Sequence, residues 1–155
     1  MGYDVDEPSI HTARATTAAA GLEDRVSFEL AAGETLTENT YDAAFVLEAL
    51  HDMPRPVEVL AAIRKAVRPD GVVIIMDEAV ADELTGPGDD IDKIMYGYSM
   101  FICLPDGMSS TPSAATGTVM RRSTLESYAR QAGFQGVTVL PIEDFAFFRF
   151  YQLQG

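Results

Sequence analysis

The fold is decided by residues 41–78, which read YDAAFVLEALHDMPRPVEVLAAIRKAVRPDGVVIIMDE. Residues Tyr41–Leu47 form a nearly continuous apolar run, as expected for a strand whose sheet is covered by helices on both faces. Apolar residues then recur at helical spacing over 56–67, and a turn at 68–71 leads to a second apolar strand at 72–76. A strand, a helix and a strand in this order predict parallel strands with a right-handed crossover.

The rest of the chain predicts more helices and strands around this unit. Ser123 and Glu126 have the spacing of a capping box at a helix start. The predicted segments are a helix capped by Asp6 and ended by Gly21, a strand at 26–30, an apolar stretch at 91–104, a loop at 105–118, a helix from Ser123 to near Gly133, and strands at 137–142 and 145–153. The last two strands are joined by a short turn, so we expect them to be antiparallel. Together these segments predict an open α/β sheet that ends in an antiparallel hairpin.

The composition excludes several classes of protein. The chain has 155 residues, of which 47% are hydrophobic, so it is long enough for one domain with a sizeable core. Its formal net charge of -13 speaks against nucleic acid or an anionic membrane as a partner. The longest apolar run is too short to cross a bilayer, and the N-terminus does not resemble a signal peptide. Cys103 is the only cysteine, which excludes a disulfide framework and suits a reducing cytoplasm.

Two acidic residues near the N-terminus are candidates for ligand binding. Asp4 and Asp6 lie between the end of a short strand and the start of a helix. Ligands of open α/β sheets bind at the carboxyl ends of the strands, where a carboxylate can accept hydrogen bonds from both hydroxyls of a ribose. The alternative is that both acids only cap the helix.

A histidine follows the first long strand of the predicted sheet. His51 lies in the sequence LEALHDM, between Glu48 and Asp52, where such sheets place their active sites. Histidine titrates near neutral pH and is a natural general base. The alternative is a loop histidine that only caps or packs. The other histidine, His11, lies on the first predicted helix, where we expect it to be exposed.

The sequence resembles the class I S-adenosylmethionine-dependent methyltransferases, and among them the bacterial small-molecule enzymes, some of which carry a winged-helix dimerisation domain. The resemblance rests on the order and spacing of GYDVDEPSI, RVSFELAAGETL, YDAAFVLEALHDM and AIRKAVRPDGVVIIMDE, and it covers essentially the whole chain. It implies a partial Rossmann-like sheet with the cofactor S-adenosylmethionine. The third of these motifs is similar to the HDW segment of O-methyltransferases, with Met53 where tryptophan is typical.

The resemblance assigns roles to individual residues. His51, with Asp52 beside it, falls on the histidine that deprotonates an acceptor hydroxyl. The residues implied in cofactor binding are Asp4 at the ribose, Val5 at the adenine, Ala32, Gly33 and Glu34 in the loop near the adenine, and Glu48 facing the methionine part. Ala32 stands where an aspartate is usual, so the adenine contact departs from the family pattern.

The acceptor side is assigned to the apolar stretch after the second long strand. In such a fold Met95, Tyr96 and Met100 are expected to line an apolar pocket for a small acceptor, although a plain buried helix or a dimer contact explains the stretch equally well. We expect no metal, because the sequence shows no evident cluster of histidine and carboxylate ligands. Asp77 and Glu78 are interpreted as loop caps, with metal binding, as in some catechol-type relatives, as the alternative that the resemblance leaves open. Cys103 is interpreted as a small core residue without a partner base.

The glycine-rich motif of this family is absent from the sequence, so residues 1–155 are interpreted as the later part of a methyltransferase domain, truncated at its start. Without the first strand, the strand at Tyr41–Leu47 becomes an open edge of the sheet. An open edge invites pairing with another chain. We therefore expect either a homo-oligomer or an exchange of strands between chains.

Two other functions remain open at this stage. A catalytically inactive methyltransferase fold for dimerisation or small-molecule binding would suit the missing glycine motif and Ala32. A dinucleotide-dependent oxidoreductase would also place an acid at the ribose after a strand. The LHDM and RPDGVVIIMDE sequences favour the methyltransferase over the oxidoreductase.

Overall fold

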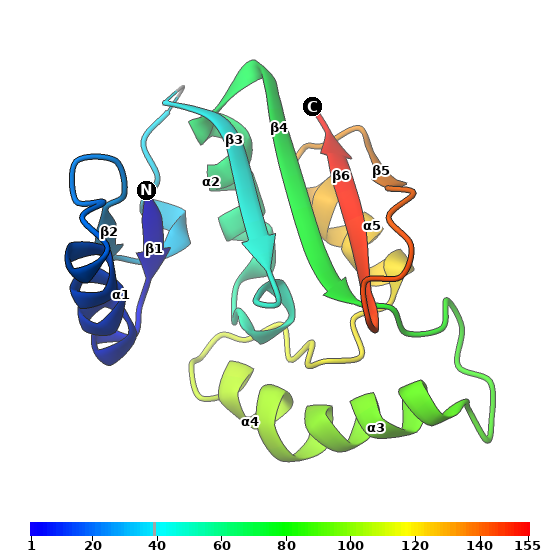
Figure 1. Ribbon diagram of the computed structural model, residues 1–155. Helices are drawn as coiled ribbons and strands as arrows, with labels where there is room; N and C mark the ends of the chain where they lie inside the picture. The colour runs from blue at the N-terminus through cyan, green and yellow to red at the C-terminus, as the bar shows by residue number, and fades with distance from the viewer. Residues whose placement is uncertain (39) are drawn as a thin grey trace. The chain divides into compact units, whose positions relative to one another are not determined.

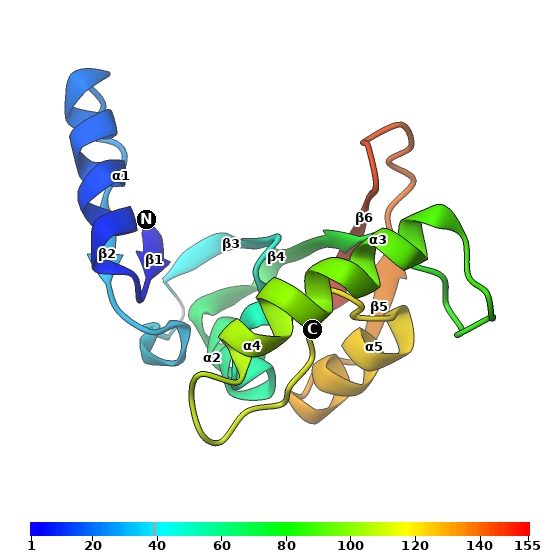
Figure 2. The same cartoon turned by 90° about the horizontal axis from the view of Figure 1, so that it is seen from below.

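The computed structural model describes residues 1–38 and 40–155 and divides into two compact units. The N-terminal unit comprises Met1–Leu36 and the C-terminal unit comprises Thr37–Gly155. Figures 1 and 2 show the elements of each unit. Among the described residues, none of the helices combines the length and the apolar character that a membrane crossing requires.

The N-terminal unit is a strand–helix–strand arrangement. Strands β1 (Gly2–Asp4) and β2 (Phe28–Leu30) pair in parallel, helix α1 (Glu7–Ala19) connects them, and the short 3-10 helix η1 (Gly33–Thr35) follows β2. The Asp6 carboxylate accepts a hydrogen bond from the Ser9 backbone at 2.8 Å, which confirms the predicted cap. Arg14 on α1 donates to the Phe28 carbonyl oxygen and so fastens the helix to β2.

The C-terminal unit is built on a four-stranded sheet in the order β3-β4-β6-β5. Its elements are β3 (Tyr41–Leu47), η2 (Leu50–Asp52), α2 (Pro56–Ala66), β4 (Val67–Glu78), α3 (Asp90–Tyr98), the π-helix η3 (Ser99–Cys103), α4 (Leu104–Gly107), α5 (Arg122–Gln131), β5 (Gly136–Val139) and β6 (Phe148–Gln154). Strands β3 and β4 are parallel, and β6 is antiparallel to both of its neighbours. The structure thus confirms the open α/β sheet and its antiparallel C-terminal hairpin.

The core of this unit lies between the sheet and helices α2 and α5, which cover the same face of the sheet (Figure 2). Its most deeply buried apolar side chains are Leu50, Leu60, Ile75, Leu125 and Tyr151. On β3, Val46 is buried whereas Phe45 is 64% exposed and Leu47 is also exposed. The expectation that helices cover both faces of this strand is therefore wrong, because an apolar run does not reveal which side chains find a partner.

Three local predictions fail for identifiable reasons. Residues 68–71 do not form a separate turn but belong to β4 as a bulge, because Tyr41 pairs with Val67 while Ala43 already pairs with Val72. The capping box at Ser123 is absent, since Arg121 precedes α5 without a side-chain cap and Arg122 pairs with Glu126 at 2.8 Å instead. The predicted loop at 105–118 is shorter than expected because residues 105–107 continue the helix as α4.

Strand β3 lies at the edge of the four-stranded sheet. Among the described residues it pairs with β4 alone. The predicted open edge is therefore present within this unit, and Phe45 projects from it largely exposed.

Candidate active site

The ends of the two parallel strands bring together residues that are far apart in the sequence. Strands β3 and β4 are parallel and have their carboxyl ends at the same end of the sheet. Helices α3 and α4 run across this end (Figure 1). The Glu48 backbone still donates to the Met76 carbonyl at 2.9 Å, and Glu48 then takes a positive φ of 56° that turns the chain into η2. Asp77 and Glu78 are the last residues of β4. His51 on η2 thereby comes to lie against both.

His51 is surrounded by carboxylates and is only 2% exposed. Its Nδ1 lies 2.9 Å from Asp77 Oδ1 and 3.4 Å from Glu78 Oε2. Its Nε2 lies 3.3 Å from Asp52 Oδ1. The contact with Asp77 is the shortest of the three, so we assign the donated N–H to Nδ1, which leaves Nε2 as the nitrogen that exchanges a proton.

The pKa values of this cluster are raised. Burial lowers the pKa of His51, but the hydrogen bond to Asp77 and the negative charges around the ring outweigh burial and raise the pKa to about 10. Burial raises the pKa of Glu48 to about 7, and the adjacent carboxyl of Glu78 adds to the rise. Burial and the proximity of Asp77 likewise raise the pKa of Glu78 to about 7. Without a ligand, His51 is therefore the positively charged imidazolium at neutral pH, and the surrounding carboxyl groups stabilise this charge.

Several buried oxygens of the cluster have no hydrogen-bond partner among the described residues. They are Glu48 Oε1, Asp52 Oδ1, Asp77 Oδ2 and Glu78 Oε2. Three of them still lie within 4 Å of a His51 ring nitrogen, so Asp77 Oδ2 is the oxygen of this group with no nearby donor among the described residues. A buried carboxylate oxygen without a partner is costly, so the cluster suits a positively charged or hydrogen-bond-donating group.

The structure corrects three expectations about this region. Potential ligand atoms of Glu48, His51, Asp77 and Glu78 all lie within 4.8 Å of one another, so a cluster of histidine and carboxylates does exist. Asp77 and Glu78 are buried against His51 rather than being loop caps. Cys103 also has a basic neighbour, because its sulfur lies within 4.8 Å of atoms of His51 and Asp52. The sequence does not reveal these contacts, because His51 and Asp77 are 26 residues apart and only the folded sheet brings them together.

The cofactor residues predicted in the N-terminal unit lie at the carboxyl ends of its two parallel strands. Asp4 ends β1, and its Oδ1 accepts a hydrogen bond from the Asp6 backbone at 2.9 Å. Val5 follows and is 73% exposed. Ala32 precedes η1, which contains Gly33 and Glu34, and the neighbouring Ala31 backbone donates to the Asp4 carbonyl at 2.9 Å. The two predicted segments thus converge within this unit.

The three predicted acceptor residues do not share one environment. Met95 is buried at 3% exposure, whereas Tyr96 and Met100 are exposed. The Tyr96 hydroxyl accepts a hydrogen bond from Arg121 Nη2 at 3.0 Å. Helical spacing explains the division, because Met95 lies on the face of α3 that packs on the rest of the unit.

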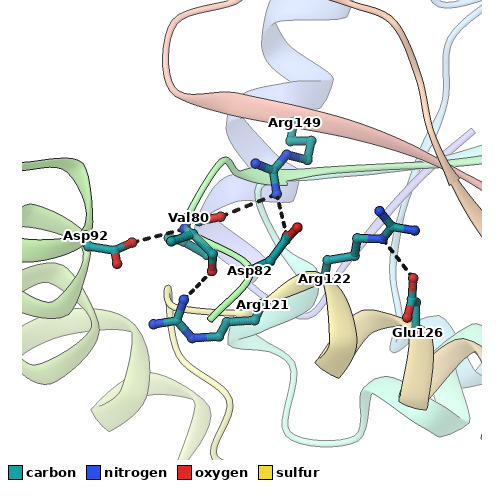
Figure 3. A network of polar contacts seen from close by, with 8 residues as sticks. Val80, Asp82, Asp92, Arg121, Arg122, Glu126 and Arg149 are labelled. Carbon is teal, nitrogen blue, oxygen red and sulfur yellow. Dashed lines mark hydrogen bonds and ion pairs between the residues drawn. The ribbon is translucent and has the colours of Figure 1, made fainter. Parts of the chain in front are cut away.

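A polar network holds α3 and the loop before it (Figure 3). Arg149 on β6 donates to the Val80 carbonyl and to Asp82 Oδ1, each at 3.3 Å. Asp92 on α3 accepts from the Ala81 backbone at 3.1 Å, and Arg121 donates to the Ala81 carbonyl. Arg121 therefore links the start of α5 to the loop before α3 and to Tyr96 on α3.

The raised pKa values predict that folding stability falls as the pH rises. Glu48 and Glu78 have pKa values near 7 when folded and 4.5 as unperturbed groups, so their contribution is present below pH 4.5 and is lost as the pH rises through 7. The contribution of His51 is present below its unperturbed value of 6.5 and is lost as the pH rises through about 10. Urea unfolding between pH 5 and pH 10 measures this decline, and Glu78→Gln should flatten the part below pH 7. A decline below pH 7 that is identical in this variant would contradict the assignment.

Comparisons with known proteins agree with this fold. The family described as "Methyltransferase domain" matches residues 1–73. The highly reducing polyketide synthase ctvA of Aspergillus terreus is 32% identical over 103 residues, which are 65% of this chain and 4% of that protein. The methyltransferase GfsG of Streptomyces halstedii is 32% identical over 85 residues, which are 54% of this chain and 31% of that protein.

A solved structure extends the likeness over nearly all of the chain. The S-adenosylmethionine-dependent methyltransferase SibL in its apo form superimposes with a TM-score of 0.69 at 23% identity, over 99% of this chain and 42% of that one. The chain thus spans about a third of GfsG and less than half of SibL. The chain therefore has the fold of a solved S-adenosylmethionine-dependent methyltransferase, and its residues 1–73 are similar to the methyltransferase domain family.

Proposed function

We propose that this chain forms part of an enzyme that transfers the methyl group of S-adenosylmethionine to a hydroxyl group of a small, apolar acceptor, with His51 as the general base. The observation that carries the proposal is the buried His51–Asp77 pair, whose atoms are 2.9 Å apart at the carboxyl ends of β3 and β4. A base with one nitrogen held by a carboxylate and the other directed elsewhere is the arrangement that proton abstraction requires.

Besides the base, methyl transfer requires the protein to bind and align the two reactants. When bound, S-adenosylmethionine supplies a methyl group that its sulfonium has already activated. The chain must then align the acceptor oxygen and remove its proton. Asp77 fixes the ring of His51 through Nδ1, and Nε2 receives the proton in the neutral form of the imidazole. Because His51 is nearly inaccessible, the acceptor must displace part of the chain that surrounds it. Gly117 is one neighbour of this residue, since its backbone donates to the His51 carbonyl at 3.1 Å.

The charge of the cluster suits a cationic methyl donor. Glu48, Asp77 and Glu78 gather around one histidine, and a sulfonium or ammonium group would compensate the excess of carboxyl groups. The same compensation would lower the pKa of His51 and so make its neutral form available. We therefore assign the positive charge that the cluster lacks to the cofactor and not to a metal ion.

For the N-terminal unit, taken by itself, we propose that the residues at the carboxyl ends of β1 and β2 contact the ribose and the adenine of the cofactor. Asp4 is exposed, and its Oδ2 has no hydrogen-bond partner among the described residues, so that oxygen is available to a ribose hydroxyl. Val5 presents an exposed apolar side chain that suits an adenine ring. Ala32, Gly33 and Glu34 would supply the neighbouring contacts.

Thermal unfolding tests this cofactor assignment. We expect S-adenosylmethionine to raise the Tm of the chain, because a ligand that binds the folded state stabilises it. Asp4→Ala should remove most of the rise, whereas Glu29→Gln, at an exposed acid on β2, should leave it intact. The measurement is repeated with EDTA. If EDTA abolishes the increase in Tm, the His51 cluster binds a metal ion. If S-adenosylmethionine does not increase the Tm at all, the result favours a catalytically inactive methyltransferase fold.

We further propose that the chain associates through the edge of β3. The edge strand pairs on one side alone among the described residues, and Phe45 stands exposed on it. We expect light scattering at micromolar concentration to show an oligomer, and Phe45→Lys to reduce the association. Phe147→Lys, at an exposed phenylalanine before β6, is the matched control. A monomer under these conditions would contradict the proposal.

A further inference from the structure

A second concave site lies at the end of the sheet opposite to His51. It is a cavity of about 350 Å³ lined by residues from the end of α2, the start of β4 and the C-terminus of the chain. Figure 1 shows where these elements lie. The residues that give it its character are Arg64, Lys65, Arg68, Val73, Phe134 and Leu153. Its volume lies within the range of small-molecule sites, which is roughly 300–1,000 Å³.

The cavity gathers positive charge in a strongly acidic chain. Three of the chain's 11 lysine and arginine residues line it, although the net charge of the chain is -13. Arg68 pairs with Asp42, whereas Arg64 and Lys65 have no hydrogen bond or ion pair among the described residues. Glu38 is the one acidic side chain that the described residues contribute to the lining. The C-terminal end of a helix favours cations, which explains the position of Arg64 and Lys65 in the last turn of α2. It does not explain the apolar cavity beside them.

The floor of the cavity is apolar. Val73, Phe134 and Leu153 are almost completely buried and present only their edges to the cavity. An occupant with an apolar body would gain from covering these edges, while a terminal anion would reach the guanidinium and ammonium groups at the mouth.

We propose that this cavity binds a small organic anion, a carboxylate or phosphate head on a short apolar body, at a site separate from that of the methyl transfer. Arg64 and Lys65 hold the head, and the floor formed by Val73, Phe134 and Leu153 receives the body. The inference does not depend on the methyltransferase activity, since none of its residues belongs to the His51 cluster.

Calorimetric titration with four probes tests the proposal. We expect hexyl phosphate and hexanoate to bind, and the tighter of the two identifies the head as phosphate or carboxylate. Inorganic phosphate should bind at least about tenfold more weakly than hexyl phosphate, because it lacks the apolar body. Hexanol, which lacks the charge, should not bind. No binding by either charged probe, or equal binding by hexanol, would overturn the proposal.

Variants and spectroscopy locate the site. The double variant Arg64→Gln, Lys65→Gln should weaken binding of the better probe by at least about tenfold, because two charged hydrogen-bond donors are lost. Lys93→Gln, which removes one charge from α3, is the control and should change nothing. Amide resonances of residues 64–73 should shift on binding, also in the presence of saturating S-adenosylhomocysteine. Unchanged affinity in the double variant, or shifts confined to the surroundings of His51, would refute the site.

Discussion

Replacing His51 by alanine should lower the rate of methyl transfer to a hydroxyl acceptor by about 10²–10⁴-fold, which is the usual contribution of a general base. The variant leaves Asp77 without its partner and removes both ring nitrogens that contact the carboxyl groups of the cluster. The rate is measured as transfer of tritium from labelled S-adenosylmethionine to the best acceptor in a panel of apolar phenols and alcohols. Near-ultraviolet circular dichroism establishes that the variant is folded.

His11→Ala is the matched control for this experiment. His11 is the only other histidine and is exposed on α1. It should leave the rate unchanged. If His51→Ala transfers methyl groups as fast as the wild type, His51 has no part in proton transfer, and the acceptor is a group that needs no base.

Replacing Asp77 by asparagine should lower the pKa of His51 from about 10 to below about 8. The change removes the hydrogen-bonding carboxylate, which is the strongest of the influences that raise the pKa, while the burial that lowers it remains. An NMR titration of ¹⁵N-labelled histidine measures the pKa directly, with His11 as a second signal in the same spectrum. The limb of the pH–rate profile that reports the base should move to lower pH by the same amount.

The control for this variant is Asp82→Asn. Asp82 is an exposed carboxylate that pairs with Arg149 and does not contact His51. Its replacement should leave the pKa of His51 near 10. A pKa that stays near 10 in Asp77→Asn would show that other carboxylates hold the proton, and Asp77 would then lose its role in positioning the ring.

The sequence predicts the frame of the fold well where pattern and local chemistry agree. Strand Tyr41–Leu47 and the helix start at Pro56 lie where the apolar pattern places them, and Asp6 caps α1 as expected. The pattern fails where tertiary contacts decide. The bulge at 68–71 depends on Gly71, since a Cβ there would lie 2.7 Å from the Asp42 carbonyl oxygen, and no periodicity reveals such an approach.

The position of the candidate site could be predicted from the sequence, but the full set of residues that form it could not. The position of His51 follows from the rule that active sites lie at the carboxyl ends of strands. Its functional role came from the resemblance to a family. The burial of Asp77 and Glu78 against His51 depends on the register of β3 with β4, which the sequence does not specify. One signal in the sequence could have indicated these contacts: Asp77 and Glu78 end a buried apolar strand. Charged residues are rarely buried without a partner, so a nearby partner could have been expected.

Calorimetric titration of the chain with S-adenosylhomocysteine tests the central claim most directly, because this product reports on the cofactor site without an acceptor. The account predicts binding in the micromolar range and a loss of affinity in Asp4→Ala. The absence of binding at millimolar ligand would contradict the claim that this chain carries a working methyltransferase cofactor site.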